Sequence, residues 1–225
     1  MHDTILDIQT EPLSAIIASF STCRVCGFAT GDLQIALKGH PCEHCGAPSK
    51  GGILLFGMGV LSMVDLMQEL YHLKTSEQNR NQPVYLQREN HLIAIVVFFC
   101  SLGEILLEGF LRRLIVRLGL PERVEDELMS DFSINGRIHM FEVLTGRTFT
   151  LAVKELDAKG THTCRDVFKF YLDARSKRNH LLHAGNVLIV DESLPRECLL
   201  QTPKLLALFV GLHNKYIALP RTQTA

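Results

Sequence analysis

Four cysteines near the start of the chain have the spacing of a metal site. Cys23 and Cys26 form one Cys-x-x-Cys-Gly sequence, Cys42 and Cys45 form a second, and fifteen residues separate the two. Two intervening residues let both thiolates of a pair point at one ion, and the glycine that follows lets backbone amides approach the sulfurs. Four thiolates complete a closed tetrahedral shell, which leaves no open position for chemistry. The pattern therefore predicts a structural zinc ion, Zn2+.

The paired cysteines resemble the knuckles of zinc ribbons, and the resemblance covers roughly residues 20 to 50. His40 and His44 lie close enough in sequence to replace a ligand, although four cysteines suffice. Coincidental buried cysteines or a redox pair would explain two matched, glycine-flanked pairs less well. A ribbon binds nucleic acid, binds protein or only stabilises a fold, so this site alone does not indicate what the protein does.

A second set of residues that could carry chemistry lies between residues 173 and 186. Arg178 is followed directly by Asn179 and, after three more residues, by His183. Histidine transfers protons near neutral pH, and the forked guanidinium of arginine suits a phosphate. On the helix expected over residues 164–184, Asn179 and His183 share a face, whereas Arg178 and His183 lie about 140° apart. Those two therefore fit a site shared between two chains more easily than a site within one chain.

Arg178 also occupies a position that should be apolar. One helical stripe runs through Val167, Tyr171, Ala174, Arg178 and Leu181. A charge on such a stripe requires a partner or a ligand. Glu104 and Glu108, one turn apart in an earlier apolar segment, are the candidate partners. Glu108 also stands four residues before Arg112, and a solvated pair of that kind stabilises a helix by only about 0.3–0.5 kcal/mol.

The arginine, the polar residue beside it and the histidine after four intervening positions resemble the motif of the HEPN family (higher eukaryote and prokaryote nucleotide-binding domains). The resemblance covers residues 90–218 and implies an all-α helical bundle. It also implies a metal-independent endoribonuclease that acts as a homodimer and cleaves RNA by attack of the 2'-hydroxyl, leaving a 2',3'-cyclic phosphate. In that role His183 moves protons, Arg178 holds the phosphate and Asn179 orients the site. The family often has an acidic residue four positions before a basic one in an earlier core helix; Glu108 and Arg112 match that spacing, and Glu104, one turn before, adds a second carboxylate.

The same resemblance suggests a toxin-like or defence role, with an antitoxin or another protein as a partner. Two alternatives stay open. A non-catalytic relative would bind RNA or a nucleotide through the same cleft, and an interaction protein would use the ribbon to recruit a partner. A structural explanation also exists, because Arg178 and His183, like the neighbouring His180, lie towards a helix C-terminus, where the helix dipole favours cations. The spacing of His180 from Arg178 does not match the motif.

The charge balance and the cysteine content bound the class of protein. The 225 residues include 23 basic and 24 acidic side chains, so nucleic acid would be bound through a local patch rather than by the net charge. No secretory signal is visible, and seven cysteines then favour thiols and metal over disulfides. The apolar runs 51–64 and 92–103 are each shorter than the roughly 20 residues of a membrane span. We therefore expect a soluble cytoplasmic protein without a membrane segment.

The apolar pattern predicts a zinc-ribbon module, residues 1–50, and an all-helical domain, residues 51–225. Helices are expected at about 53–74, 90–118, 121–131, 136–144, 149–157 and 164–184, with a last helix to about 218. Pro203 would begin or kink that last helix. A strand is expected over residues 13–20, a surface loop over 75–83 and an extended segment over 187–190. Cys100, Cys164 and Cys198 are isolated, and Cys100 is expected to fill the core.

Overall fold

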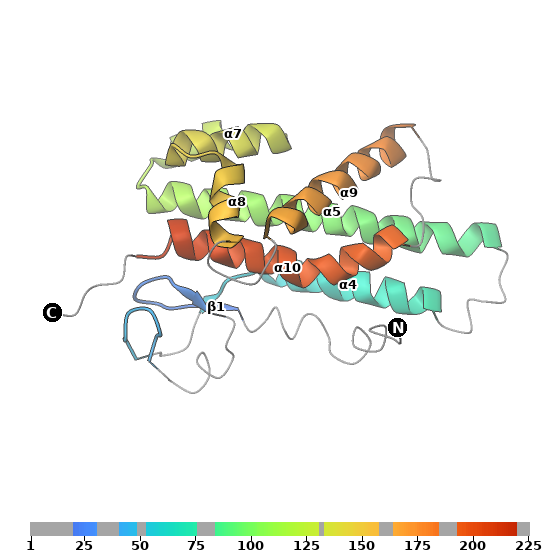
Figure 1. Cartoon of the computed structure of the whole chain (residues 1–225), viewed down its shortest axis with the longest axis horizontal. Coiled ribbons are helices and arrows are strands. Elements are labelled where there is room, and N and C mark those ends of the chain that lie inside the picture. Colours follow the sequence, from blue (N-terminus) through green and yellow to red (C-terminus); the bar gives the residue numbers. More distant parts are fainter. Residues whose placement is uncertain are drawn as a thin grey trace.

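The computed structural model describes residues 20–30, 41–48, 53–75, 84–130, 133–157, 164–184 and 193–219. These residues form a mostly helical fold with one small sheet (Figure 1). The predicted mostly helical class is confirmed. The helices are α4 (Met58–Thr75), α5 (Val84–Arg117), α6 (Glu122–Leu128), α7 (Ile134–Thr145), α8 (Phe149–Asp157), α9 (Cys164–Ala184) and α10 (Ser193–Tyr216). The strands are β1 (Ser21–Thr22), β2 (Ala29–Thr30) and β3 (Ile53–Leu54), which pair antiparallel in the order β2-β1-β3.

Helix α5 is the central element of the fold. It packs against α4, α7, α9 and α10, and its side chains Ile95, Phe99 and Leu107 are fully buried. Among the described residues, the His91–Arg117 part of α5 is the one helix long and apolar enough to cross a membrane, and half of its most apolar stretch is buried against other elements. Its position explains this composition, since a central core helix needs apolar side chains on several faces.

Gly103 allows α9 to cross α5 closely. A Cβ atom at this position would lie 2.1 Å from the ring of Tyr171 on α9, which is far inside van der Waals contact. Tyr171 is 1% exposed, and the rings of Phe99 and Phe168 pack against it. The close crossing brings the middle of α9 onto the part of α5 that carries Glu104.

Short local signals mark the beginning and the end of α7. The Ser133 side chain accepts a hydrogen bond from the backbone nitrogen of Gly136 at 2.9 Å and caps the start of α7. Gly146 ends α7 with a φ of 67°, a left-handed conformation that favours glycine. Helices α8 and α9 have the predicted bounds, 149–157 and 164–184.

The structure corrects three of the expected helix limits. Residues 53–54 form β3, because β1 supplies backbone partners for this apolar segment, and α4 begins only at Met58. Helix α5 begins at Val84 rather than near residue 90. Pro203 lies inside α10, so it does not begin that helix. The predictions for residues 13–19, 76–83 and 187–190 lie outside the described residues.

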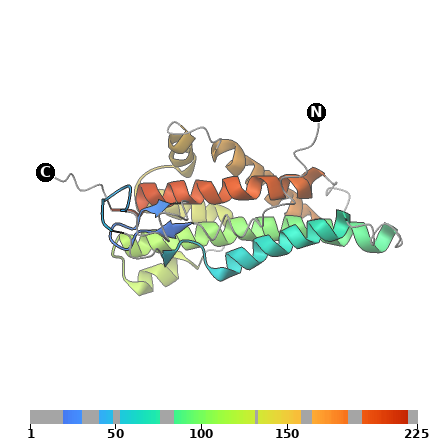
Figure 2. The ribbon, with the colours of Figure 1, turned by 90° about the horizontal axis from the view of Figure 1, so that it is seen from below.

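The sheet is held against the end of α10 (Figures 1 and 2). The Asn214 side chain accepts a hydrogen bond from the backbone nitrogen of Ala29 at 2.6 Å and donates one to the carbonyl oxygen of Ala29 at 2.8 Å. The backbone nitrogen of Leu219 donates to the carbonyl oxygen of Cys26 at 2.8 Å. Because β3 follows residue 50 and pairs with β1, the sheet draws residues from both sides of the domain boundary expected there.

Candidate functional sites

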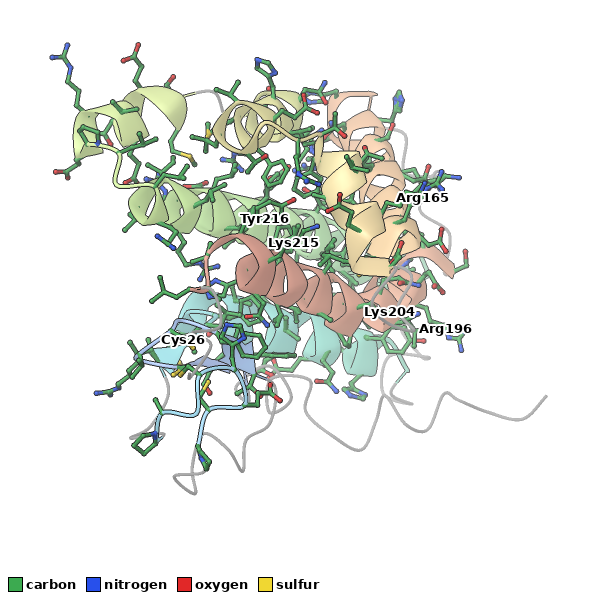
Figure 3. All side chains as sticks on the ribbon, turned by 60° about the vertical axis from the view of Figure 1, so that its left-hand side comes forward. Cys26, Arg165, Arg196, Lys204, Lys215 and Tyr216 are labelled. Carbon is green, nitrogen blue, oxygen red and sulfur yellow. The ribbon has the colours of Figure 1, made fainter. Side chains whose placement is uncertain are left out.

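The four cysteines of the two knuckles come together at one point. Their Sγ atoms all lie within 4.8 Å of one another, with 3.8 Å between Cys23 and Cys45 and 3.7 Å between Cys26 and Cys42. Zn–S bonds of about 2.3 Å in a tetrahedron would place the sulfurs about 3.8 Å apart. The group can therefore hold a metal ion, and its sulfurs gather beside Cys26, near the end of α10 that carries Lys215 and Tyr216 (Figure 3).

The glycines after each cysteine pair adopt a backbone conformation that favours glycine. Gly27 and Gly46 have φ values of 72° and 70°, in the left-handed region. The backbone nitrogen of Gly27 donates to the carbonyl oxygen of Cys23 at 2.8 Å, and that of Gly46 donates to Cys42 in the same way at 2.8 Å. The two knuckles are thus equivalent turns, and the chain folds each of them locally.

His44 does not join this group of cysteines, as far as the described residues show. The Nε2 atom of His44 lies 2.8 Å from the carbonyl oxygen of Leu219, and its ring stacks on Phe28 with centroids 4.7 Å apart. His40 lies outside the described residues. Burial raises the pKa of Cys26 to about 12, so a bound cation would have to displace a proton from this thiol near neutral pH.

Arg178 is paired with Glu104, one of the two partners that the sequence suggested. Its Nη2 atom donates to Oε1 of Glu104 at 2.5 Å, and the Arg178 side chain is 13% exposed. The Nε atom of Arg175 donates to the same carboxylate oxygen at 3.1 Å. Within the described part of the chain, Glu104 is the one carboxylate bonded to these two guanidinium groups, so this cluster keeps an excess positive charge. The role of Arg175 was not found from the sequence, although it stands three residues before Arg178 and therefore on a neighbouring part of the helix.

Glu108 belongs to a different set of contacts. Its carboxylate accepts hydrogen bonds from Arg137 at 2.8 Å and from Arg112 at 3.1 Å, and Arg112 also pairs with Glu125 at 2.7 Å. Glu108 therefore links α5 to α7, and Arg112 links α5 to α6; among the described residues no hydrogen bond or ion pair joins Glu108 to Arg178. The predicted pair between Glu108 and Arg112 is present.

Arg137 donates to the side chain of Glu108 and to the backbone of Glu104. It is 5% exposed, and besides Glu108 it contacts the carbonyl oxygen of Glu104 at 3.2 Å. The sequence analysis missed this residue, although a signal existed. Arg137 falls three residues after Ile134 and four before Phe141, both buried, so it occupies an apolar stripe just as Arg178 does.

The motif residues Asn179 and His183 lie towards the solvent. His183 is exposed in the last turn of α9, and Asn179 is partly exposed. This end of α9 rises away from α5 (Figure 1). Within the part of the chain that the structure describes, no hydrogen bond or ion pair joins His183 to Arg178 or Glu104. The three motif residues thus form no complete site within one chain.

Two buried groups close to the cluster are neutral. Burial, reinforced by the charge of Glu104, raises the pKa of Tyr171. Burial also raises the pKa of Cys100 to about 12, and Cys100 is fully buried, as expected for a residue that fills the core. Neither group therefore offers a nucleophile at neutral pH.

The described residues provide two separate chemical groups. Four cysteine sulfurs can hold a metal ion. Arg175 and Arg178 form a cluster with excess positive charge, and the exposed His183 follows them on the same helix. The cysteine group can stabilise a fold without taking part in a reaction, and the arginine cluster can attract an anion.

Comparison of the chain with protein-family models, with curated proteins and with solved structures gave no match.

Proposed function

We propose that the protein is a metal-independent endoribonuclease of the HEPN type that acts as a homodimer. The observation that carries the proposal is the sharing of Glu104 by Arg175 and Arg178, which leaves excess positive charge shortly before the exposed His183 on the same helix. RNA supplies the anion that such a charge attracts, and histidine supplies proton transfer near neutral pH.

In the proposed reaction, the ribose 2'-oxygen attacks the adjacent phosphorus and the bond to the 5'-oxygen breaks. His183 accepts the proton of the 2'-hydroxyl, and the partner subunit's His183, in its protonated form, donates a proton to the departing 5'-oxygen. Arg175 and Arg178 hold the phosphate while its charge increases. Asn179, on the same face as His183, orients the substrate. The products are a 2',3'-cyclic phosphate and a free 5'-hydroxyl.

A dimer is proposed because one chain supplies one exposed motif histidine, whereas the reaction needs one proton acceptor and one proton donor. The exposed side of α9 also carries aliphatic side chains that a second copy would cover. Leu182, next to His183, is 56% exposed, and Leu172 is 37% exposed. Burial of these side chains would contribute to association.

We propose zinc as the ion of the cysteine group and a structural role for it. Four thiolates at tetrahedral spacing suit zinc and leave no coordination position for a substrate. When bound, zinc would fix both knuckles and, through their contacts with α10, the sheet. Free thiols and a thiolate-held metal are typical of the cytoplasm, where we place the protein.

The low exposure of Arg178 and its ion pair with Glu104 favour a second candidate function, that of a non-catalytic protein which binds RNA or a nucleotide. In that case Arg178 mainly attaches α9 to α5, and the excess charge holds a ligand without turnover. The ribbon could equally recruit a partner protein, because its knuckle exposes Val25 to 62%.

The test is cleavage of labelled structured RNAs by the pure protein in excess EDTA, with the fold followed by circular dichroism. His183→Ala should reduce the cleavage rate by about 100-fold or more, because a proton-transfer group is lost. His180→Ala, an exposed histidine of the same helix, is the matched control and should keep the rate. Arg178→Ala should also abolish cleavage. Binding of RNA by all variants without any cleavage would favour the second candidate.

A further inference from the structure

The Tyr171 side chain is buried beside the arginine cluster, but its hydroxyl group has no function in the free protein. Tyr171 is 1% exposed, and its hydroxyl has no hydrogen-bond partner among the described residues. A buried hydroxyl without a partner costs free energy, because it has given up its hydrogen bonds to water. Packing of the ring explains the burial of this side chain but not its oxygen atom, which a phenylalanine would lack.

The hydroxyl end of the ring lies against Gly103, the residue before Glu104. A Cβ atom at Gly103 would lie 2.1 Å from the ring and 2.7 Å from Cζ, the carbon that carries the hydroxyl. Tyr171 stands four residues before Arg175 and seven before Arg178, so all three lie on the side of α9 that faces α5. Burial raises the pKa of Tyr171, and the charge of Glu104 raises it further. The hydroxyl therefore keeps its proton and remains a donor.

Glu104 has an oxygen atom that can accept a hydrogen bond from such a donor. Arg175 and Arg178 both bond to Oε1, and within the described part of the chain no hydrogen bond or ion pair reaches Oε2. Each oxygen of a carboxylate can accept two hydrogen bonds, so this carboxylate is filled at one oxygen and open at the other. The Glu104 side chain is 29% exposed and is thus not fixed by packing on every side.

Binding of a phosphate would change the contacts of Arg178. Its Nη2 atom is bonded to Glu104, and its Nε atom is buried without a partner among the described residues. To place its fork on a phosphate, Arg178 has to leave Glu104. The carboxylate then loses the shorter of its two hydrogen bonds and keeps only the one from Arg175. A further donor to Glu104 would compensate for this loss in the bound state.

We propose that Tyr171 is a positioning residue whose hydroxyl donates to the Glu104 carboxylate when Arg178 turns from Glu104 to a phosphate of RNA. The inference rests on the proposed function and extends it to a residue outside the motif. The hydroxyl has no partner in the free protein and gains one in the complex, so it shifts the equilibrium towards the complex. Glu104 stays bonded to α9 through Arg175 and Tyr171, and the helix keeps its place on α5 while Arg178 moves.

A packing role and a positioning role predict different effects of Tyr171→Phe. If the side chain only fills space, the substitution leaves the binding of RNA unchanged. If the hydroxyl takes over Glu104, the substitution weakens binding without weakening the fold, because the free protein loses only a group that has no partner. A damaged fold would instead lower the melting temperature together with the affinity.

The experiment measures binding of a fluorescent single-stranded RNA to the full-length protein by anisotropy. The RNA is 2'-O-methylated throughout and therefore cannot be cleaved by attack of a 2'-hydroxyl. Tyr171→Phe should weaken binding about ten-fold, the effect of losing a hydrogen bond to a charged group, and should melt at the same temperature as the unmodified protein or higher. Tyr216→Phe, at the end of α10, is the matched control (Figure 3). Its hydroxyl is also buried without a partner among the described residues, and this variant should bind RNA as before.

A double-mutant cycle at low salt tests the link to Arg178. In Arg178→Ala no exchange of partners occurs, so the addition of Tyr171→Phe should change the remaining affinity by less than about two-fold. The inference is overturned if Tyr171→Phe binds the RNA as tightly as the unmodified protein, if Tyr216→Phe loses as much affinity, or if the two substitutions in the cycle act additively.

Cleavage of an unmethylated RNA, measured in parallel, separates this inference from the proposed reaction. Binding that depends on Tyr171 without any cleavage would overturn the ribonuclease activity and support the role of Tyr171. Cleavage together with unchanged binding by Tyr171→Phe would overturn the role of Tyr171 alone. A protein that binds neither RNA would overturn both.

Discussion

The Nε2 atom of His213 lies 2.8 Å from the carbonyl oxygen of Gly27, and this contact joins α10 to the first cysteine knuckle. The carbonyl oxygen can only accept, so Nε2 carries the proton and Nδ1 does not. His213 is 4% exposed, and Nδ1 has no hydrogen-bond partner among the described residues. Burial lowers the pKa of His213, and the nearby charge of Arg113 acts in the same direction. The buried site therefore favours a neutral ring, although the hydrogen bond to Gly27 on its own favours the protonated one.

Lowering the pH should weaken the fold through His213. Its ordinary pKa is 6.5 and its pKa in the folded protein is lower, so the folded state binds the proton less well than the unfolded chain. The stability that the neutral ring contributes is thus present above pH 6.5 and is lost as the pH falls through the folded pKa. His213→Gln keeps a donor but does not titrate. Urea unfolding should lose less free energy between pH 7 and pH 5 in this variant than in the unmodified protein, and equal losses would count against the role of His213.

Removal of the metal should destabilise the helices as well as the knuckles, because Cys26 and Ala29 are bonded to residues at the end of α10. Atomic absorption should find one zinc per chain and none in Cys26→Ser. The melting temperature of that variant should fall by several degrees. Cys164→Ser, at an isolated cysteine, is the control and should retain zinc. Zinc retained by Cys26→Ser would contradict the site.

Glu104→Gln should destabilise the protein because it leaves Arg178, which is 13% exposed, without a counter-charge. We expect a loss of about 1–3 kcal/mol in the free energy of unfolding. Asp173→Asn is the matched control. Asp173 pairs with Lys177 at 3.0 Å, but both side chains are well exposed, and the loss should stay below about 0.5 kcal/mol. Urea denaturation measures both free energies of unfolding. Similar losses would mean that the ion pairs of Glu104 stabilise the fold no more than the exposed pair of Asp173 and Lys177 does.

Gly103→Ala should be strongly destabilising, whereas Gly109→Ala in the same helix should not. The first substitution drives a methyl group into the Tyr171 ring, 2.1 Å away, and the second meets only the end of the Arg113 side chain at 3.9 Å. We expect a loss of about 1–3 kcal/mol or more at Gly103 from overpacking and a gain of up to about 1 kcal/mol at Gly109 from helix propensity. Thermal unfolding followed at 222 nm, the usual helix signal, would check both. A mild effect at Gly103 would show that α9 can shift on α5.

Leu182→Glu should convert the proposed homodimer into monomers, because it places a charge on the exposed side of α9 beside His183. Leu151→Glu on α8, where the leucine is 44% exposed, is the matched control and should leave the dimer intact. Size-exclusion chromatography with light scattering gives the mass of each species. A strictly monomeric unmodified protein would argue against a site shared between two chains.

The parts of the fold that could be predicted are those with local signals. The cysteine group follows from two short sequences, and the chain folds each of them as a local turn. The bounds of α9 follow from a long stripe of apolar residues, and the position of Arg178 on that stripe indicated a buried partner. Glu104 was one of two candidates because helical periodicity gives the face of a residue but not the helix that will cover it.

The missed features depend on packing between distant segments. Arg175 and Arg178 share one carboxylate only because Gly103 lets α9 cross α5 at that point. The two residues of β3 are too short to carry an alternating pattern, so their apolar side chains were predicted as the start of a helix. The partner strand β1 lies about 30 residues earlier in the chain, and the pairing is visible only once both are placed.

The side chain of Asn214 has a further consequence for the sheet. Strand β2 is an outer strand, and its free backbone groups would ordinarily offer a template on which another chain could add a strand. At Ala29 the amide of Asn214 satisfies both the backbone donor and the backbone acceptor, as a neighbouring strand would. Helix α10 thus terminates the sheet with a single side chain, and this flank is closed to strand addition and to aggregation by that route.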